Sequence, residues 1–232
     1  MKTSGIGVRS HHFAARAGNG RPVHRLGTRG QPEESRASIL KAAVAEFAEN
    51  GIAGARTDAI ARAARVNKAL LYYYFKDKDA LYDAVLDHVF SGLRARVKPV
   101  LESTLPPKAK MLAYVEEYFD YIAANPKFPR VVQAEWMRSS AKGAARMQRV
   151  AKEYFRPIFE KLVEVLREGV QAGEFREVNP MDFVPSVVAL IVFYFGSAPL
   201  MKTLMKVDPL SEERIRERRA FVLEFISMAL FR

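Results

Sequence analysis

The stretch from Thr57 to Phe75, Thr-Asp-Ala-Ile-Ala-Arg-Ala-Ala-Arg-Val-Asn-Lys-Ala-Leu-Leu-Tyr-Tyr-Tyr-Phe, predicts two short helices joined by a tight turn. The hydroxyl of Thr57 is expected to cap the first helix by accepting a hydrogen bond from an orphan backbone N–H. Asn67 is a second N-cap candidate ten residues later, so the second helix is expected to begin at Lys68. Apolar residues recur at helical spacing on one face of the first helix: Ile60, Ala61 and Ala64.

The second of these helices is expected to bury one edge and to present the other to solvent. Its buried residues are expected to be Leu71, Tyr74 and Phe75, and its outward-facing residues Lys68, Ala69, Leu70, Tyr72 and Tyr73. A short helix with lysine and tyrosine on its free face suits the major groove of DNA. The stretch therefore has the pattern of a helix-turn-helix.

With its flanks, from about Ile39 to Val85, this segment resembles the DNA-binding domain of the TetR-type transcriptional regulators. The pattern of that family is a Thr, then Ile-Ala, then Ala-Gly-Val-Ser, then Leu-Tyr-x-Tyr-Phe, then a Lys and a Leu. The matching positions here are Thr57, Ile60-Ala61, Ala64-Arg65-Val66-Asn67, Leu71-Tyr72-Tyr73-Tyr74-Phe75, Lys78 and Leu81.

Two positions in the turn depart from the family pattern. Arg65 replaces the customary glycine, and Asn67 replaces the customary serine. Asparagine tolerates turn and cap geometry well, so the second change is mild. Arg65 must tolerate the backbone of the turn, even where that backbone is left-handed, and it adds a positive charge beside the expected DNA surface.

The resemblance implies roles for individual residues. Residues expected to approach base edges are Lys68, Ala69, Leu70 and Tyr73, and those expected to hold phosphates are Thr57, Tyr72 and Lys78. It also implies a homodimer that binds an inverted-repeat operator on double-stranded DNA, usually as a repressor, and that is released by a small effector.

Positive charge is placed where DNA contact needs it, although the domain as a whole is not basic. The chain has 232 residues and a net charge of +11, yet residues 33–90 hold eight basic and nine acidic residues. The basic residues around the two short helices are Arg56, Arg62, Arg65, Lys68, Lys76 and Lys78. A local basic face is what phosphate binding requires.

Residues 1–32 form a separate basic segment with six Lys or Arg, no acid and glycines spread along it. The missing hydrophobic periodicity predicts a disordered tail. Three interpretations remain: an extension without a role, a basic arm that adds phosphate or minor-groove contacts, and a targeting segment. The glycine content opposes the amphipathic helix of a transit peptide.

Composition limits the other functions. The chain has no cysteine, and His11, His12 and His24 lie in the basic tail while His88 stands alone, so we expect no metal site and no cofactor. The longest apolar run, residues 183–200, is interrupted by two prolines and reads as a buried helix rather than a membrane span of about 18 residues or more. We therefore expect a soluble, cytoplasmic protein.

Everything after the tail is helical in pattern, which predicts an all-α fold. Residues 33–90 are expected to form a three-helix domain with the helix-turn-helix, and residues 91–232 a helical ligand-binding and dimerisation domain. A long fourth helix is expected to open at Asp77 or Asp79 and to end at Pro99. Later helices are expected at 108–125, 130–140, from 143 to 171 with a kink or a new start at Pro157, from 179 to 196, and from Ser211 onward.

The last two of these helices bear on oligomeric state. Residues 183–195 are apolar on almost every face of their helix, and such a helix is buried on all sides. The last helix carries a stripe with Phe221, Val222 and Phe225. In TetR-type regulators a pair of this kind forms a four-helix bundle between two subunits. The alternative is an ordinary core within a monomer.

Aromatic residues are frequent in the central helices. Stripes of this kind are more often core than ligand box, but the resemblance implies an internal cavity for an apolar effector. The residues expected to line it are Tyr118, Phe119, Trp136, Phe159 and Phe193, with Glu135 and Arg138 as the nearest polar groups. Trp136 is the only tryptophan, and its indole N–H needs a partner if it is buried.

Two classes of function remain. The first is a ligand-responsive DNA-binding regulator, and the second is a helical enzyme or small-molecule carrier with a vestigial N-terminal domain. The sequence has no nucleophile–base pair, no metal-ligand spacing and no glycine-rich phosphate loop, so we expect no enzyme.

Overall fold

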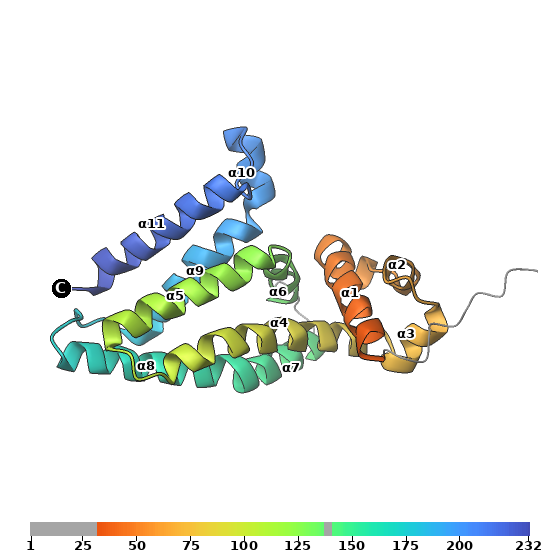
Figure 1. Cartoon of the computed structure of the whole chain (residues 1–232). Helices are drawn as coiled ribbons and strands as arrows, with labels where there is room; N and C mark the ends of the chain where they lie inside the picture. The colour runs from red at the N-terminus through yellow and green to blue at the C-terminus, as the bar shows by residue number, and fades with distance from the viewer. Residues whose placement is uncertain (1–31, 137–140) are drawn as a thin grey trace, which may run out of the picture. The chain divides into compact units, whose positions relative to one another are not determined.

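The computed structural model describes residues 32–136 and 141–232, apart from the side chains of Trp136 and Ala141. Over these residues the chain is helical, and an isolated bridge joins Phe175 to Phe231 (Figure 1). The predicted all-α fold is confirmed. The basic tail, Arg138 and the Trp136 side chain lie outside the described residues.

The first three helices make up the helix-turn-helix region. They are α1 (Pro32–Gly54), α2 (Thr57–Ala63) and α3 (Lys68–Tyr74). Gly51 has φ 58° within the last turns of α1, a left-handed backbone that suits glycine. The side chain of Asn67 accepts a hydrogen bond from the Leu70 N–H at 2.7 Å, which confirms the N-cap predicted for the second helix.

The cap predicted for the first short helix is wrong. The N-cap of α2 is Arg56, and its carbonyl accepts the N–H groups of Ala59 and Ile60. Thr57 therefore lies one position inside the helix, with no cap hydrogen bond from a side chain there. Its hydroxyl lies 3.2 Å from the hydroxyl of Tyr72 on α3 instead.

The long helix α4 (Lys78–Leu101) begins where expected and ends later than expected. Asp77 is its N-cap and accepts a hydrogen bond from the Ala80 N–H at 2.8 Å. The predicted end at Pro99 is wrong, because the helix continues through this proline to Leu101. Pro99 lies in the last turn of α4, where it removes one backbone hydrogen bond, and Val100 and Leu101 after it are still helical.

Four helical segments build the central part. They are α5 (Pro107–Ala124), α6 (Phe128–Trp136), α7 (Ala141–Val150) and α8 (Arg156–Gln171), with a π-helical turn (Ala151–Phe155) between α7 and α8. Pro157 lies in the first turn of α8, as one of the two predicted alternatives had it. The π-turn places a backbone bond from the Arg156 N–H to the Ala151 carbonyl directly before this proline.

The last helices are α9 (Pro180–Gly196), α10 (Ala198–Met205) and α11 (Glu212–Leu230). Helices α9 and α11 begin where predicted, with Asn179 and Ser211 as their N-caps, whereas α10 was not predicted. Within the described residues no single helix is long and apolar enough to cross a membrane. The pair of α9 and α10, bent by 63°, reaches that length and apolarity only together.

Two hydrophobic cores share α4. The first lies under α1–α3 and takes the part of α4 up to Phe90, and the second takes the part from Leu93 onward. Phe128, Val131 and Val150, which come later in the chain, also belong to the first core. Along α4, the first core ends and the second begins near residue 90, the predicted domain boundary. Later residues return to the first core, so a single division of the chain does not separate the cores, and the domain division remains a prediction.

Candidate nucleic-acid interface and effector cavity

Most residues that were predicted to face outward from α3 are exposed in the structure. Tyr73 is 80% exposed and Tyr72 is 41% exposed, and Lys68 and Ala69 are also exposed. Leu70 is half-buried, so it departs from the prediction of an outward-facing residue. Leu71 and Phe75 hold the opposite edge in the first core.

The turn before α3 has a left-handed backbone at Arg65, the position where the family pattern has glycine. Arg65 has φ 57°, one of two left-handed residues other than glycine in the described part of the chain. An L-residue in this region carries a steric cost of about 1–2 kcal/mol. Arg65 is exposed, so its guanidinium extends into solvent beside α3.

Polar contacts join α2 to α3 on the side of the expected DNA surface. Lys68 forms an ion pair of 2.8 Å with Asp58, and both side chains are about half exposed. The hydrogen bond and the charge of Lys68 hold the pKa of Asp58 below its usual value, and the same pair raises the pKa of Lys68. Together with the contact between Thr57 and Tyr72, this places the predicted phosphate-binding and base-reading groups side by side.

Lys78 has a different environment from the one its predicted role suggests. Its ammonium donates to the carbonyls of Ala53 and Ala55, both at 3.2 Å, and the side chain is half-buried. It therefore closes the end of α1 in the free protein. An ammonium has three donors, so one N–H remains for a phosphate.

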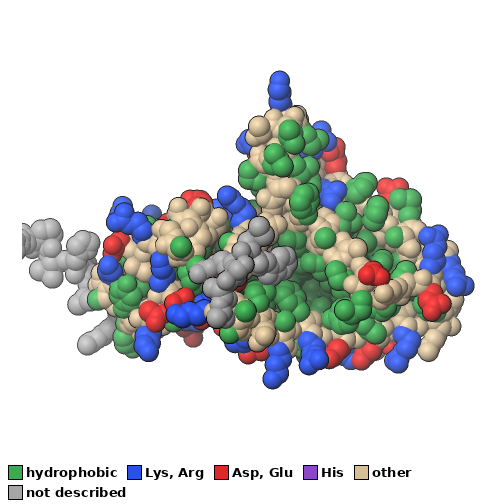
Figure 2. All heavy atoms as spheres, turned by 180° about the vertical axis from the view of Figure 1, so that it is seen from behind, with side chains coloured by type: hydrophobic (Ala, Val, Ile, Leu, Met, Phe, Trp, Pro, Cys, Tyr) green, Lys and Arg blue, Asp and Glu red, His purple; other side chains and the backbone are tan. Residues whose placement is uncertain are grey.

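A cavity of about 490 Å³ lies among α4, α5, α6, α8 and α9. Figure 2 shows a hollow lined by hydrophobic side chains on this face of the molecule. Aromatic rings contribute much of the wall, namely Phe90, Tyr114, Tyr118, Tyr121, Phe128, Phe155, Phe159 and Phe193. The volume lies within the range of about 300–1,000 Å³ that is usual for ligand pockets.

Of the five residues predicted to line a cavity, three do so. Tyr118, Phe159 and Phe193 are in the wall, and Phe193 is also 67% exposed. Phe119 does not line the cavity, because it points into the second core and packs on Phe195 with ring centroids 5.4 Å apart. The side chain of Trp136 lies outside the described residues.

Of the polar groups of the wall, the sequence predicted only Tyr118, and Tyr114, Tyr121 and Gln133 were not predicted. Tyr114 lies one helical turn before Tyr118 on α5, and their rings stack with centroids 6.0 Å apart. Tyr121 and Gln133 also contribute to the wall. The hydroxyl of Tyr121 donates to the Val89 carbonyl at 2.7 Å. The spacing of Tyr114 and Tyr118 is a signal that the sequence contained, whereas Gln133 on α6 had none.

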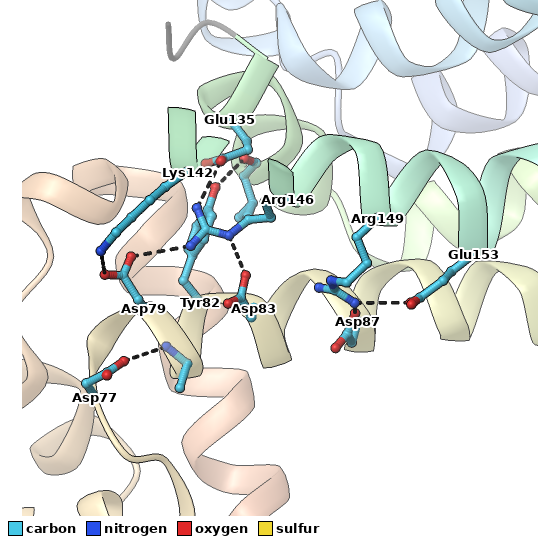
Figure 3. A network of polar contacts seen from close by, with 12 residues as sticks. Asp77, Asp79, Tyr82, Asp83, Asp87, Glu135, Lys142, Arg146, Arg149 and Glu153 are labelled. Carbon is cyan, nitrogen blue, oxygen red and sulfur yellow. Dashed lines mark hydrogen bonds and ion pairs between the residues drawn. The ribbon is translucent and has the colours of Figure 1, made fainter. Parts of the chain in front are cut away.

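An ion-pair cluster connects the start of α4 with α6 and α7 (Figure 3). Arg146 of α7 is buried and binds Asp83 and Asp79 of α4, the latter at 3.3 Å, and Glu135 of α6 at 3.0 Å. Lys142 also pairs with Asp79 at 3.4 Å. Burial opposes the charge of Arg146, yet the carboxylates around it raise its pKa above the usual value.

Glu135, predicted as a polar group beside the cavity, has a different partner in the structure. Glu135 is fully buried, and its carboxylate faces the guanidinium of Arg146 rather than the cavity. Through this pair, the helix that carries Gln133 is tied to the first turns of α4. The same turns follow directly on α3.

Comparison with known protein families agrees with this arrangement of a helix-turn-helix and a cavity-bearing helical domain. Residues 39–85 match the model of the bacterial regulatory proteins of the tetR family, and residues 107–226 match a tetracyclin repressor-like C-terminal domain. The chain belongs to the TetR family.

Individual TetR-family proteins are similar over most of their length. The HTH-type transcriptional repressor SCO4008 of Streptomyces coelicolor is 34% identical over 75% of this chain and 84% of its own. The HTH-type transcriptional repressor NicS of Pseudomonas putida is 26% identical over 77% of this chain and 84% of its own. The crystal structure of the transcriptional regulator SCO4942 from Streptomyces coelicolor covers 84% of this chain and 97% of its own, at 26% identity and a TM-score of 0.61.

Proposed function

We propose that this TetR-family chain is a ligand-responsive repressor that binds an inverted-repeat operator as a homodimer and acts in the cytoplasm. The observation that carries the DNA-binding part is the free face of α3, where Lys68, Ala69, Tyr72 and Tyr73 are exposed behind the Asn67 cap. A short helix held from behind by a hydrophobic edge is suited to the major groove.

The roles proposed for single residues follow from their positions. Lys68, Ala69, Leu70 and Tyr73 approach base edges, and Thr57, Tyr72 and Lys78 hold phosphates. The ion pair with Asp58 keeps the Lys68 ammonium at the surface of α3 until DNA competes for it. Phosphate contacts set the register of the protein, whereas base contacts carry the sequence preference.

Apolar side chains left exposed on α9, α10 and α11 support the homodimer. They are Met181, Phe193, Leu200, Leu204, Met205, Phe221, Phe225 and Met228. Exposed apolar patches of this kind mark interaction surfaces in proteins that fold in water. Two copies joined through them would present two α3 helices to successive major grooves, about 34–36 Å apart or at a multiple of that spacing.

We propose that α4 transmits effector binding from the cavity to the DNA-binding helix α3. Val89, Phe90 and Leu93 of α4 form part of the cavity wall, and the N-terminus of the same helix follows α3. An effector that binds the conformation unable to bind DNA more tightly would release the operator. The coupling in such switches amounts to about 1–3 kcal/mol, or roughly 5–150-fold in operator affinity.

The test is a gel-shift and fluorescence-anisotropy titration with the DNA upstream of the protein's own gene, comparing an intact inverted repeat with a single half-site. Lys68→Ala and Arg167→Ala each remove one positive charge, but Arg167 lies exposed on α8. Lys68→Ala should change the preference among operator variants by about tenfold or more, and Arg167→Ala should change nothing.

Absence of specific DNA binding by the unmodified protein would contradict the proposal. If that protein nevertheless bound small molecules in its cavity, the helical carrier or enzyme would be the better description.

A further inference from the structure

We propose that the effector is an uncharged, largely apolar molecule with a hydrogen-bond acceptor, such as a ketone or ester oxygen. The hydroxyl groups of Tyr114 and Tyr118 donate hydrogen bonds to this acceptor. The inference rests on the proposed function only in naming this ligand as the effector. Binding in the cavity itself can be measured without DNA.

The cavity wall lacks charged side chains among the described residues and therefore disfavours ionic ligands. Among the described residues that line it, none is Asp, Glu, Lys, Arg or His. A charged group enclosed by this wall would lose its hydration without a counter-charge to replace it, which costs far more than enclosing an apolar group. The buried charges nearby, Arg146 and Glu135, bind each other.

The two phenols supply the polar recognition. Tyr114 is 3% exposed and Tyr118 is 5% exposed, and both line the cavity. Neither hydroxyl forms a hydrogen bond with another residue in the part of the chain that the structure describes, whereas Tyr121 in the same wall donates to the Val89 carbonyl. The two hydroxyl oxygens are not among the fully buried unpaired side-chain atoms of the described residues, so they are accessible from the cavity, and a ligand that supplies an acceptor can bind them.

The protonation of these phenols makes them donors. Burial raises the pKa of Tyr114 and the pKa of Tyr118 well above the ordinary value of a phenol. Both groups therefore keep their protons at neutral pH. An acceptor oxygen on the ligand is the complementary group.

Gln133 adds a third polar group to the wall. Its amide lies against Gly196, where a Cβ atom would come within 2.6 Å of Nε2. The missing side chain at Gly196 leaves room for this amide at the end of α9. Because an amide both donates and accepts, Gln133 extends recognition to a second polar atom of the ligand.

The first experiment compares ligands of one shape and different charge. The probes are methyl 2-naphthoate, the 2-naphthoate anion, (2-naphthylmethyl)trimethylammonium and 2-propylnaphthalene, with a parallel octyl series of methyl octanoate, octanoate and octyltrimethylammonium. Calorimetry on the full chain at neutral pH should show at least one ester binding about tenfold or more tightly than both of its charged counterparts.

The inference is overturned if a charged probe binds as tightly as the matching ester, or if neither ester binds up to its solubility limit. These outcomes leave operator binding by the same preparation untouched. Failure of the effector class is therefore distinguishable from failure of the proposed function, which would appear as loss of operator binding by the unmodified protein.

The second experiment removes single hydroxyl groups. Tyr114→Phe and Tyr118→Phe should each weaken the affinity for the bound ester about three- to tenfold, because each deletes one hydrogen bond, and should leave the affinity for 2-propylnaphthalene unchanged. Tyr194→Phe is the matched control, since Tyr194 is buried on α9 but donates to the Pro209 carbonyl and does not line the cavity.

Thermal unfolding of each variant separates lost binding from lost structure. A folded double variant, Tyr114→Phe with Tyr118→Phe, that kept the full affinity for the ester would show that the phenols do not recognise the ligand.

Discussion

At the residue scale, the turn between α2 and α3 combines an unfavourable backbone with a favourable charge. Arg65 holds φ 57° where a glycine would have no steric cost. Asn67 offsets part of this by capping α3 at 2.7 Å. The arginine side chain remains exposed beside the proposed DNA surface, so this position exchanges some stability for a positive charge.

Arg65→Gly is therefore expected to change stability and DNA binding in opposite directions. Relief of the left-handed strain, less the extra chain entropy of glycine in the unfolded state, should raise the free energy of unfolding by about 1 kcal/mol or less. Loss of the charge should lower the salt slope of operator binding by about one unit. Urea denaturation and anisotropy titrations over a range of salt concentrations measure the two effects.

Arg65→Asn serves as the control, because asparagine also loses the charge but tolerates the left-handed region better than most residues. An unchanged salt slope in both variants would show that Arg65 does not contact a phosphate.

At the element scale, the contact between α4 and α7 is electrostatic along a row of aspartates. Asp79, Asp83 and Asp87 follow one another at four-residue spacing on one face of α4, and Lys142, Arg146 and Arg149 of α7 face them (Figure 3). Arg146 differs from its neighbours because it is buried and also reaches Glu135 of α6. The start of α4 is therefore held by α6 and α7 at once.

Arg146→Ala should lower the free energy of unfolding by about 3–5 kcal/mol, because it leaves the carboxylate of Glu135 buried without its cation. Arg149→Ala is the matched control on the same helix, and its side chain is 34% exposed, so its loss should cost about 1 kcal/mol or less. Urea denaturation of both variants measures the difference. Equal costs would mean that burial does not distinguish the two ion pairs.

At the scale of the whole molecule, the exposed apolar surface on α9, α10 and α11 limits what a single chain can bury. Tyr194 and Phe195 of α9 are buried, but Phe193, which directly precedes them, faces outward at 67% exposure. Phe221 and Phe225 of α11 stack with centroids 6.0 Å apart, and each is 46% exposed. A second copy of the chain is the proposed cover for these rings.

Phe225→Glu should therefore convert a dimer into a monomer at micromolar concentration and weaken binding to an intact inverted repeat. The new carboxylate would lie in an apolar interface without a partner, which costs several kcal/mol if the position is fully covered. Light scattering coupled to size-exclusion chromatography measures the mass, and anisotropy measures operator affinity.

Leu105→Glu is the matched control for this prediction, because Leu105 is 44% exposed and precedes α5, outside the three helices concerned. A monomeric mass for the unmodified protein at the same concentration would contradict the proposed homodimer.

The sequence by itself determined the local features of this protein. The cap at Asn67 and the helix start at Ser211 involve groups only a few residues apart, so the order of residues was enough to predict them. The same applies to the spacing that identified the helix-turn-helix. For α4 the sequence left Asp77 and Asp79 as alternatives, and the structure shows that Asp77 is the cap. The cap at Thr57 failed because a hydroxyl one position inside the helix found a partner on α3.

Only the tertiary structure decided which side chains face the cavity and which face the core. Tyr118 and Phe119 are neighbours on α5 with similar hydrophobicity, yet one lines the cavity and the other packs on Phe195. Their fates depend on where α8 and α9 lie, and contacts between residues far apart in the chain determine that placement. The partner of Arg146, the engagement of Lys78 with the end of α1 and the free phenol of Tyr114 are long-range results for the same reason.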